Sequence, residues 1–315
     1  MSNTLRGLVP LLGYALLIAA TDVFAGNRLQ QLDPVAVGAL SFTAAGVWFL
    51  GLGFAREGRR AFEPLWLHGR DVLALNITTA GAWLTLLTAL KFLEPAVVNV
   101  VAFAIGPVLT VLLGPVLRRG SRVLPTEVAV AVGIVVALSL LGWGSVSGRS
   151  AVGHIATGQA VVGLLLGLAC GVACVGNVIY SKRLSDRGVS PLASLATRFF
   201  LMVAVSWAVL AVGPGMSVVD EAVPAAGVVA VIGVALPSYL GQVGIKHVEP
   251  ITASLVDTLS PVFAFLLQLA DGRLTPSALT LVCILGITAL VALAVLVRSR
   301  HETRTVVEPA VPVVT

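Results

Sequence analysis

Charged residues divide the chain into long apolar windows. An apolar window of about 18 or more residues without charge is typical of a membrane-spanning helix. Eight windows contain no Asp, Glu, Lys or Arg: 34–55, 72–90, 95–117, 128–148, 150–181, 199–219, 222–245 and 274–297. We expect each window to form one transmembrane helix.

Two further apolar segments have the same length and composition, but each contains one aspartate. Asp22 interrupts residues 8–27, and Asp257 interrupts residues 250–270. With these two segments, the sequence predicts an all-α polytopic membrane protein of ten transmembrane helices. The connections between the helices are too short to hold an independent soluble domain.

Composition agrees with this prediction. Of 315 residues, 57% are hydrophobic and 11% are charged, whereas soluble domains carry about 25% charged residues. This excludes a soluble enzyme and a secreted disulfide scaffold. Cys170, Cys174 and Cys283 all fall inside predicted helices, so we expect small buried side chains. The first apolar segment lacks a small-x-small cleavage site, so no cleaved signal peptide is expected.

Basic residues are distributed unevenly among the expected loops. If about 20 residues form each helix, one set of alternate loops and ends holds fifteen Lys and Arg residues and the other set holds four, while Arg198 is left inside the seventh helix. Positive charge beside a span tends to stay in the cytoplasm. We therefore expect both termini in the cytoplasm, in a cytoplasmic (inner) cell membrane, with residues 299–315 as a disordered tail. The basic residues read as topology signals, so nucleic acid is not an expected partner.

The two halves of the chain repeat each other. Lys91-Phe92-Leu93-Glu94-Pro95 matches Lys246-His247-Val248-Glu249-Pro250, and Gly106-Pro107 is followed later by its counterpart Ser260-Pro261. We expect one five-helix repeat over residues 1–148 and a second over residues 149–298. An odd number of helices in each repeat inverts the second copy across the membrane. Inverted repeats are typical of transporters, because two opposed copies can exchange conformations. Duplication without transport is the alternative.

The order of these motifs resembles a known family. The Lys-x-x-x-Pro pattern at both repeat positions, the run Ser-Pro-Val-Phe-Ala-Phe-Leu-Leu at 260–267 and the pair Arg198-Phe199 are similar to EamA-type members of the drug/metabolite transporter superfamily. The resemblance covers residues 8–297. It implies a carrier of small metabolites, amino acids or drugs, with a central cavity between helices 1, 3, 4, 6, 8 and 9. Helices 5 and 10 are peripheral in this family.

Three charged residues lie within the predicted spans. A charge at the centre of a bilayer costs roughly 2.5–3.5 kcal/mol by insertion scales, so Asp22, Arg198 and Asp257 need partners or water. At about 1.5 Å per residue, Arg198 and Asp257 lie about 12 and 10 Å inside the cytoplasmic starts of their helices. They are nearly level, so they either form an ion pair or bind substrate.

Proline adds a second feature to Asp257. Pro261 stands four residues later, so it leaves the Asp257 carbonyl unbonded and predicts a kink in the helix. We hypothesise that Asp257 binds an ammonium group or a coupling proton. The repeat counterpart Pro107 predicts a second kink but has no acid beside it, so the cavity should be asymmetric.

Further polar and aromatic residues are candidates for the same cavity. Asp22 and its repeat counterpart Asn177 either act at opposite gates or hydrogen-bond to neighbouring helices. Asn99, Trp83, Tyr239 and Gln242 are candidate cavity residues, and each has a purely structural alternative. The glycines at 163, 167 and 171 predict close packing within the monomer, with a homodimer face as the alternative.

Motifs of membrane enzymes and pumps are absent from the sequence. All four histidines fall in loops, span ends or the tail, and no His-Glu-x-x-His, Gly-x-Ser-x-Gly or P-loop motif occurs. We therefore expect no catalytic residue, no metal and no cofactor. The sequence favours a secondary transporter, most simply an exporter of a small molecule. A lipid or lipid-linked sugar flippase and a membrane-embedded enzyme are the alternatives.

Overall fold

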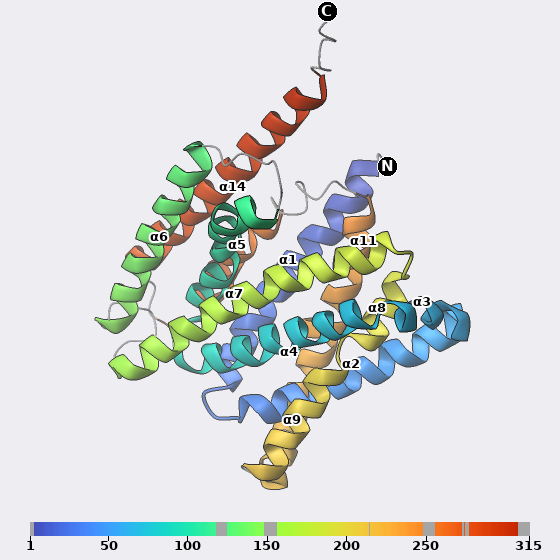
Figure 1. Cartoon of the computed structure of the whole chain (residues 1–315). Coiled ribbons are helices and arrows are strands. Elements are labelled where there is room, and N and C mark those ends of the chain that lie inside the picture. The colour runs from blue at the N-terminus through green and yellow to red at the C-terminus, as the bar shows by residue number, and fades with distance from the viewer. Residues whose placement is uncertain are drawn as a thin grey trace, which may run out of the picture.

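The computed structural model describes residues 3–117, 125–147, 156–213, 215–247, 256–272, 274 and 277–307. In this part of the chain every regular element is helical (Figure 1). The first half forms α1 (Asn3–Arg28), α2 (Pro34–Glu57), the 3₁₀ helix η1 (Arg59–Phe62), α3 (Glu63–Leu67), α4 (Gly69–Phe92), α5 (Pro95–Leu117) and α6 (Pro125–Val146). The second half forms α7 (Thr157–Asp186), α8 (Pro191–Thr197), α9 (Phe200–Val212), the 3₁₀ helix η2 (Met216–Val218), α10 (Val219–Val228), the π-helix η3 (Val229–Ala235), α11 (Leu236–His247), α13 (Ser260–Gln268) and α14 (Ala278–Val307).

Helix starts follow local sequence signals. Asp33 caps α2, because its Oδ1 accepts hydrogen bonds from the backbone N–H groups of Val35 and Ala36 at 2.9 and 3.0 Å. Ser190 caps α8 in the same way through Ala193. Proline follows both caps at the first helical turn, where its missing N–H has no partner to lose.

Eight helical stretches in the described residues are long and apolar enough to cross a membrane. Seven of them overlap the charge-free windows other than 95–117, and the eighth, Gly7–Arg28, covers the first segment that an aspartate interrupts. In α5 the apolar stretch that meets these criteria is the shorter Pro95–Gly106. Of the ninth expected helix, over residues 250–270, residues 250–255 lie outside the described residues, and α13 is the helix that the structure describes there. The connections that contain Arg118, Arg119, Arg122, Gly148 and Arg149 also lie outside them.

The expected helix boundaries, which were set by charged residues, were wrong at two helices. The seventh expected helix corresponds to the stretch Pro191–Val212 and does not begin at residue 199, because Arg198 lies inside the helix and cuts a window defined by charge. The eighth expected helix corresponds to a stretch that begins at Met216, before the expected start at 222, because Asp220 and Glu221 lie in the first turn of α10. Acidic residues are favoured there by the helix dipole. At the other end of the chain, α14 continues to Val307, into the segment expected to be a disordered tail.

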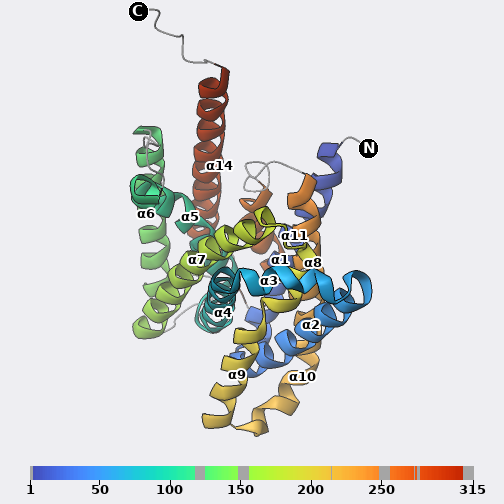
Figure 2. The same cartoon turned by 45° about the vertical axis from the view of Figure 1, so that its right-hand side comes forward.

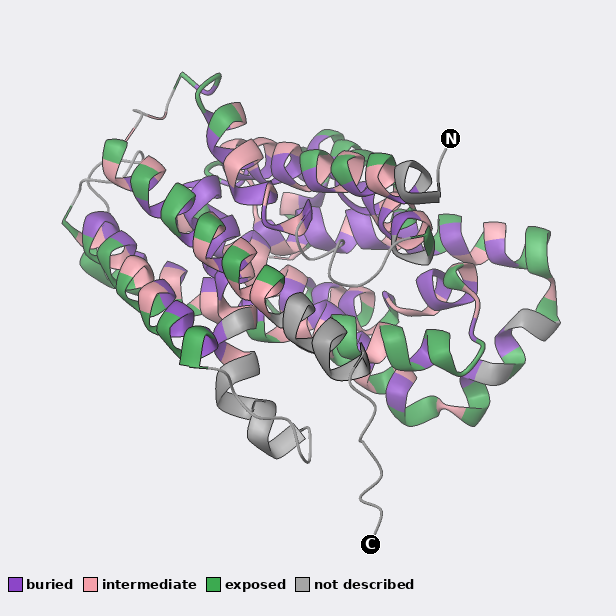
Figure 3. Cartoon of the chain, turned by 90° about the horizontal axis from the view of Figure 1, so that it is seen from above, coloured by how far each residue is buried: buried purple, intermediate pink, exposed green. Residues whose placement is uncertain are grey.

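The helices pack with apolar residues both inside and outside. Buried residues line the interior of the bundle, and exposed residues cover its outer faces (Figure 3). The outer faces carry large apolar side chains, such as Val47, Val178 and Val282, which are 66%, 68% and 67% exposed. A surface of this kind suits lipid as its solvent, and the molecule is a multi-pass membrane protein.

Close helix contacts place the two halves against each other. Helix α4 lies along α7 (Figure 2), and α1 packs against both α11 and α13. The glycine stripe of α7 faces α5: a Cβ at Gly163 would meet Leu93, one at Gly167 would meet Val101, and one at Gly171 would meet the Ala102 backbone. The stripe is therefore occupied inside the monomer. All three cysteines are free, and Cys170 and Cys283 are buried.

Candidate functional site

A first polar network joins α1, α5 and α13 in the interior. Asn99 Nδ2 donates to Asp22 Oδ2 at 2.6 Å and to Ser260 Oγ at 3.2 Å. Asp22 and Asn99 are each 2% exposed. Asn99 Oδ1 is buried and has no hydrogen-bond partner among the described residues. The network connects residues from both halves of the chain and leaves one acceptor free.

A second network joins α4 and α7 to the junction of α8 and α9. Asn177 Nδ2 donates to Thr79 Oγ1 at 2.6 Å, and its Oδ1 accepts from an Arg198 terminal nitrogen at 2.5 Å. The Arg198 guanidinium also lies 5.6 Å from the centre of the Phe199 ring. Its Nε is buried and has no partner among the described residues.

The helix is broken where Arg198 stands, and Asn76 holds the break. Asn76 Nδ2 donates to the Thr197 carbonyl at 2.9 Å, and the Leu201 N–H donates to Asn76 Oδ1 at 3.1 Å. These two backbone groups lie on either side of the junction between α8 and α9. One side chain of α4 therefore satisfies backbone groups that a break in a membrane helix exposes.

Asp257 stands at a second break. Residues 256 and 257 are helical, Thr258 and Leu259 form a turn, and α13 begins at Ser260 with Pro261 in its first turn. Asp257 Oδ1 is buried and has no hydrogen-bond partner among the described residues. Pro107, in contrast, lies within α5, which runs through its position without interruption.

Arg198 and Asp257 do not form an ion pair. The ion pairs among the described residues, with nitrogen and oxygen within 4.0 Å, join Lys182 to Asp186 and Arg183 and Arg187 to Asp71. Of the two alternatives that the sequence left open, direct pairing of Arg198 with Asp257 is thus not what the structure describes.

These residues form a central cluster, which we define as Tyr14, Asp22, Asn99, Asn177, Arg198 and Asp257. The Tyr14 hydroxyl lies within electrostatic range of Asp22, Arg198 and Asp257, and of the Cys174 thiol. The cluster combines two carboxylates, one guanidinium, two amides and a phenol. Such a set can hold a small molecule that carries both a positive and a negative group.

Aromatic rings form a wall beside the cluster. Trp83 meets Phe42 edge-on at 4.9 Å between ring centres, and Phe42 and Phe49 lie 5.3 and 6.3 Å from Phe199. Trp83 is part of this wall: it contacts Phe42, which contacts Phe199, and Phe199 directly follows Arg198.

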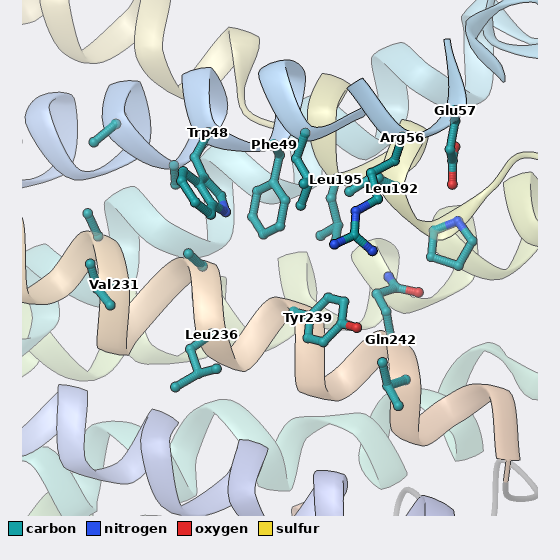
Figure 4. Close-up of a pocket in the computed structure, with 17 residues that line it drawn as sticks. Trp48, Phe49, Arg56, Glu57, Leu192, Leu195, Val231, Leu236, Tyr239 and Gln242 are labelled. Carbon is teal, nitrogen blue, oxygen red and sulfur yellow. The ribbon is translucent and has the colours of Figure 1, made fainter. Parts of the chain in front are cut away.

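Tyr239 and Gln242 lie elsewhere. They line a cleft of about 870 Å³ between α2, α8, η3 and α11, and no residue of the central cluster lines it (Figure 4). The sequence predicted both residues as cavity residues. It did not show that they lie in a cleft apart from the central cluster, because the separation of these two sites depends on how the helices pack.

Two groups of polar contacts at the ends of the bundle were not expected from the sequence. Buried Glu94 accepts from Gln268 Nε2 at 3.2 Å and from Thr280 Oγ1 at 2.7 Å, which ties α5 to the end of α13 and the start of α14. The repeated Glu-Pro pair was the available signal, since an acid next to a span start needs a partner. Arg187 pairs with Asp71 in a second group.

The side chains that the structure describes do not form a metal site. They contain no group of three or more His, Cys, Asp or Glu residues that could hold a metal ion.

The fold and the buried cluster define a polytopic membrane protein with a polar interior. The chain belongs to the EamA-like transporter family, which matches residues 5–143 and 161–298. No curated protein matches the chain. Fourteen chains of solved structures do match. One crystal structure has 24% sequence identity and a TM-score of 0.63, over 96% of this chain and 99% of the other. At that identity the likeness shows the fold alone.

Proposed function

We propose that this protein is a secondary transporter that exports a small metabolite, amino acid or drug-like molecule by alternating access. The central cluster carries this proposal, because both halves of the chain contribute polar side chains to one buried place. Three of its buried atoms, Asn99 Oδ1, Arg198 Nε and Asp257 Oδ1, have no partner among the described residues. Unsatisfied polar groups inside a membrane bundle are costly and mark substrate or ion pathways.

The chemistry of the cluster favours a charged or zwitterionic solute. The Asp257 carboxylate suits an ammonium group or a coupling proton, and the Arg198 guanidinium suits a carboxylate or phosphate. The aromatic wall around Trp83 offers an apolar face to the remainder of the molecule. Asp22 and Asn177 hold neighbouring residues in place, and we propose that they also shift when the gates move.

Ten helices in two inverted repeats give the simplest mechanism. The first turns of α1 and the last turns of α14 point to the same side of the molecule, which requires an even number of crossings (Figures 1 and 2). Eight spans are long enough to cross, and we propose that α5 and the expected segment 250–270, of which α13 is the described part, supply two further crossings. The family matches the chain twice, once in each half. Two such repeats in opposite orientation have inward-open and outward-open states of similar energy.

Basic loops support an orientation with both termini in the cytoplasm of the cell membrane. Arg187 and Arg183 meet Asp71, and Ser190 donates to Glu57, so the loops rich in basic residues gather at one end. Gln30 donates to the Lys91 carbonyl at 3.1 Å, and Asn27 to Asp271 at 3.4 Å, among loops with few basic residues. The positive-inside rule then assigns the first end to the cytoplasm.

A lipid flippase is the second candidate, because the cleft around Tyr239 and Gln242 lies at the side of the bundle. A flippase needs a polar path for the headgroup beside an apolar path for the chains. The floor of the cleft is formed by Phe49 and Leu195, each 1% exposed, and no cluster residue reaches it. These observations favour the transporter. A membrane-embedded enzyme has the least support, since the family is one of transporters.

Transport by the purified protein tests the proposal. Proteoliposomes would be loaded with a panel of labelled amino acids, organic cations and nucleotide sugars, with and without a pH gradient. We expect saturable movement of at least one zwitterionic or cationic solute, faster with the gradient. Lipid scrambling without movement of any solute would overturn the proposal in favour of the flippase.

A further inference from the structure

The cleft between α2 and α11 is a separate site with its own chemistry. We call it the lateral cleft and define it by Trp48, Phe49, Arg56, Leu195, Leu236 and Gln242, which are among the residues that line its 870 Å³. In Figure 4, α2 and the η3–α11 segment run side by side, with Trp48 and Leu236 toward one end and Arg56 and Gln242 toward the other.

The apolar part of the lateral cleft can hold most of one lipid chain. From Ala44 to Leu52 the lining follows α2 for about 12 Å at 1.5 Å per residue. Half of a hydrocarbon core of about 30 Å is about 15 Å. Trp48 and Val231 on the rim are 62% and 60% exposed, so the cleft is open to the lipid that surrounds the bundle.

The polar end of the lateral cleft carries two opposite charges. The Arg56 guanidinium points into the cleft toward Gln242 (Figure 4), and it has no ion pair within 4.0 Å in the part of the chain that the structure describes. Glu57, its neighbour in sequence, also lines the cleft and accepts a hydrogen bond from Ser190 Oγ. A guanidinium binds phosphate through two parallel hydrogen bonds, and a carboxylate binds a primary ammonium.

We propose that the lateral cleft binds one phospholipid with a primary-amine headgroup, of the phosphatidylethanolamine type. One acyl chain lies along Trp48 and Phe49, the phosphate contacts Arg56, and the ammonium contacts Glu57. The arrangement places the headgroup at the end of α2 and the chain toward the middle of the bundle, as a lipid of that leaflet requires. Binding there is independent of transport through the central cluster.

Native mass spectrometry of the full chain, released from detergent with defined lipids, tests this proposal. Phosphatidylethanolamine, phosphatidylglycerol and phosphatidylcholine with identical chains would compete for the protein. We expect one phosphatidylethanolamine to be retained about tenfold better than phosphatidylcholine, whose quaternary amine cannot donate a hydrogen bond. Equal retention of all three lipids, or preference for phosphatidylglycerol, would overturn the proposal.

Matched variants locate the lipid. Arg56→Gln should reduce retention of phosphatidylethanolamine about tenfold, whereas Arg59→Gln, on η1 outside the cleft, should leave it unchanged. Ala44→Trp fills the apolar end and should also reduce retention, whereas Val47→Trp, on another face of α2, should not. Arg56→Gln and Ala44→Trp, the two variants expected to reduce retention, change opposite ends of the cleft, so if one folds poorly the other still tests the proposal. If either of these two variants folds and still retains phosphatidylethanolamine as well as the unchanged protein does, the lipid does not bind in the lateral cleft.

Discussion

Asp257 differs from the buried acids Asp22 and Glu94 in what its carboxylate meets. Asp22 accepts from Asn99, and Glu94 accepts from Gln268 and Thr280. Asp257 Oδ1 has no partner among the described residues and lies beside a helix break. A carboxylate oxygen that has no hydrogen-bond partner in the protein is an atom to which a cation or a proton can bind.

Replacement of Asp257 should remove substrate binding or the coupling of transport to protons. In Asp257→Asn, we expect transport to fall at least tenfold or to lose its pH dependence, because the amide neither carries charge nor takes up a proton. The measurement is solute flux in proteoliposomes across a range of pH, with membrane insertion checked separately. Asp186→Asn is the control, since Asp186 is exposed and its pair with Lys182 contributes little. Unchanged flux with unchanged pH dependence would exclude a role for Asp257.

A single charged residue in an apolar segment can be identified from the sequence, but the residues that it contacts cannot. Arg198 and Asp257 could be selected because nothing else in those windows is charged. The partners of Asn99 are distant in the chain, since Asp22 and Ser260 lie 77 and 161 residues away. Tyr14 gave no signal, because a tyrosine in an apolar helix is ordinary. Only packing brings these side chains together.

Two broken helices shape the site at the level of elements. The α8–α9 junction presents Arg198, and the turn before α13 presents Asp257. Backbone groups at such breaks need partners inside a membrane, because lipid offers none. Asn76 supplies both partners at the first break, which makes α4 part of the site although it contributes no charge.

Loss of the Asn76 side chain should loosen this break. We expect Asn76→Ala to lower the free energy of unfolding by about 1–3 kcal/mol, because the Thr197 carbonyl and the Leu201 N–H lose their partner. Thermal unfolding of the detergent-solubilised protein measures this change. Ser139→Ala is matched as a control, since the Ser139 hydroxyl bonds only its own helix at an exposed position. Equal unfolding temperatures for both variants would refute the role given to Asn76.

Helix positions were predicted well where charge marks the membrane boundary, as at both ends of α2 and α4. The prediction was less accurate where a charge belongs to the helix itself, as at Arg198, Asp220 and Glu221. The π-helix η3 had no sequence signal. It lies beside α1, where a Cβ at Gly233 would meet the Thr21 side chain, so close packing and not local propensity accounts for the glycine there.

At the scale of the whole molecule, two opposed ends enclose the central cluster. One end is joined by Arg187 and Asp71, and the other by Glu94 with Gln268 and Thr280. Alternating access requires these two groups of contacts to open in turn, so that one remains closed while the other releases. The sequence predicted the repeat on which this proposal depends, but it did not identify the contacts at either end.

The proposed inverted arrangement predicts where the loops lie. A reporter fused after Thr315 should report the cytoplasm, whereas a reporter placed at Gly148 should report the opposite compartment, because five expected spans separate the terminus from that connection. Paired fusions to an enzyme active only in the cytoplasm and one active only outside it provide the measurement. If both positions report the same compartment, the second repeat is not inverted.

The proposed alternating access requires that the cluster open to both sides of the membrane, and Cys174 is placed to report this. Its thiol lies within electrostatic range of Asp22, Arg198 and Asp257. With Cys170→Ala and Cys283→Ala as background, Cys174 becomes the only cysteine in the sequence. Arg59→Cys and Ser147→Cys, at opposite ends of the bundle, provide controls that should each react from one side.

The direct measurement is labelling of Cys174 by a membrane-impermeant thiol reagent, applied to either face of oriented vesicles. Alternating access predicts that Cys174 reacts from both faces and that a transported solute slows both reactions. Reaction from one face only, with both control cysteines reacting as expected, would contradict the account.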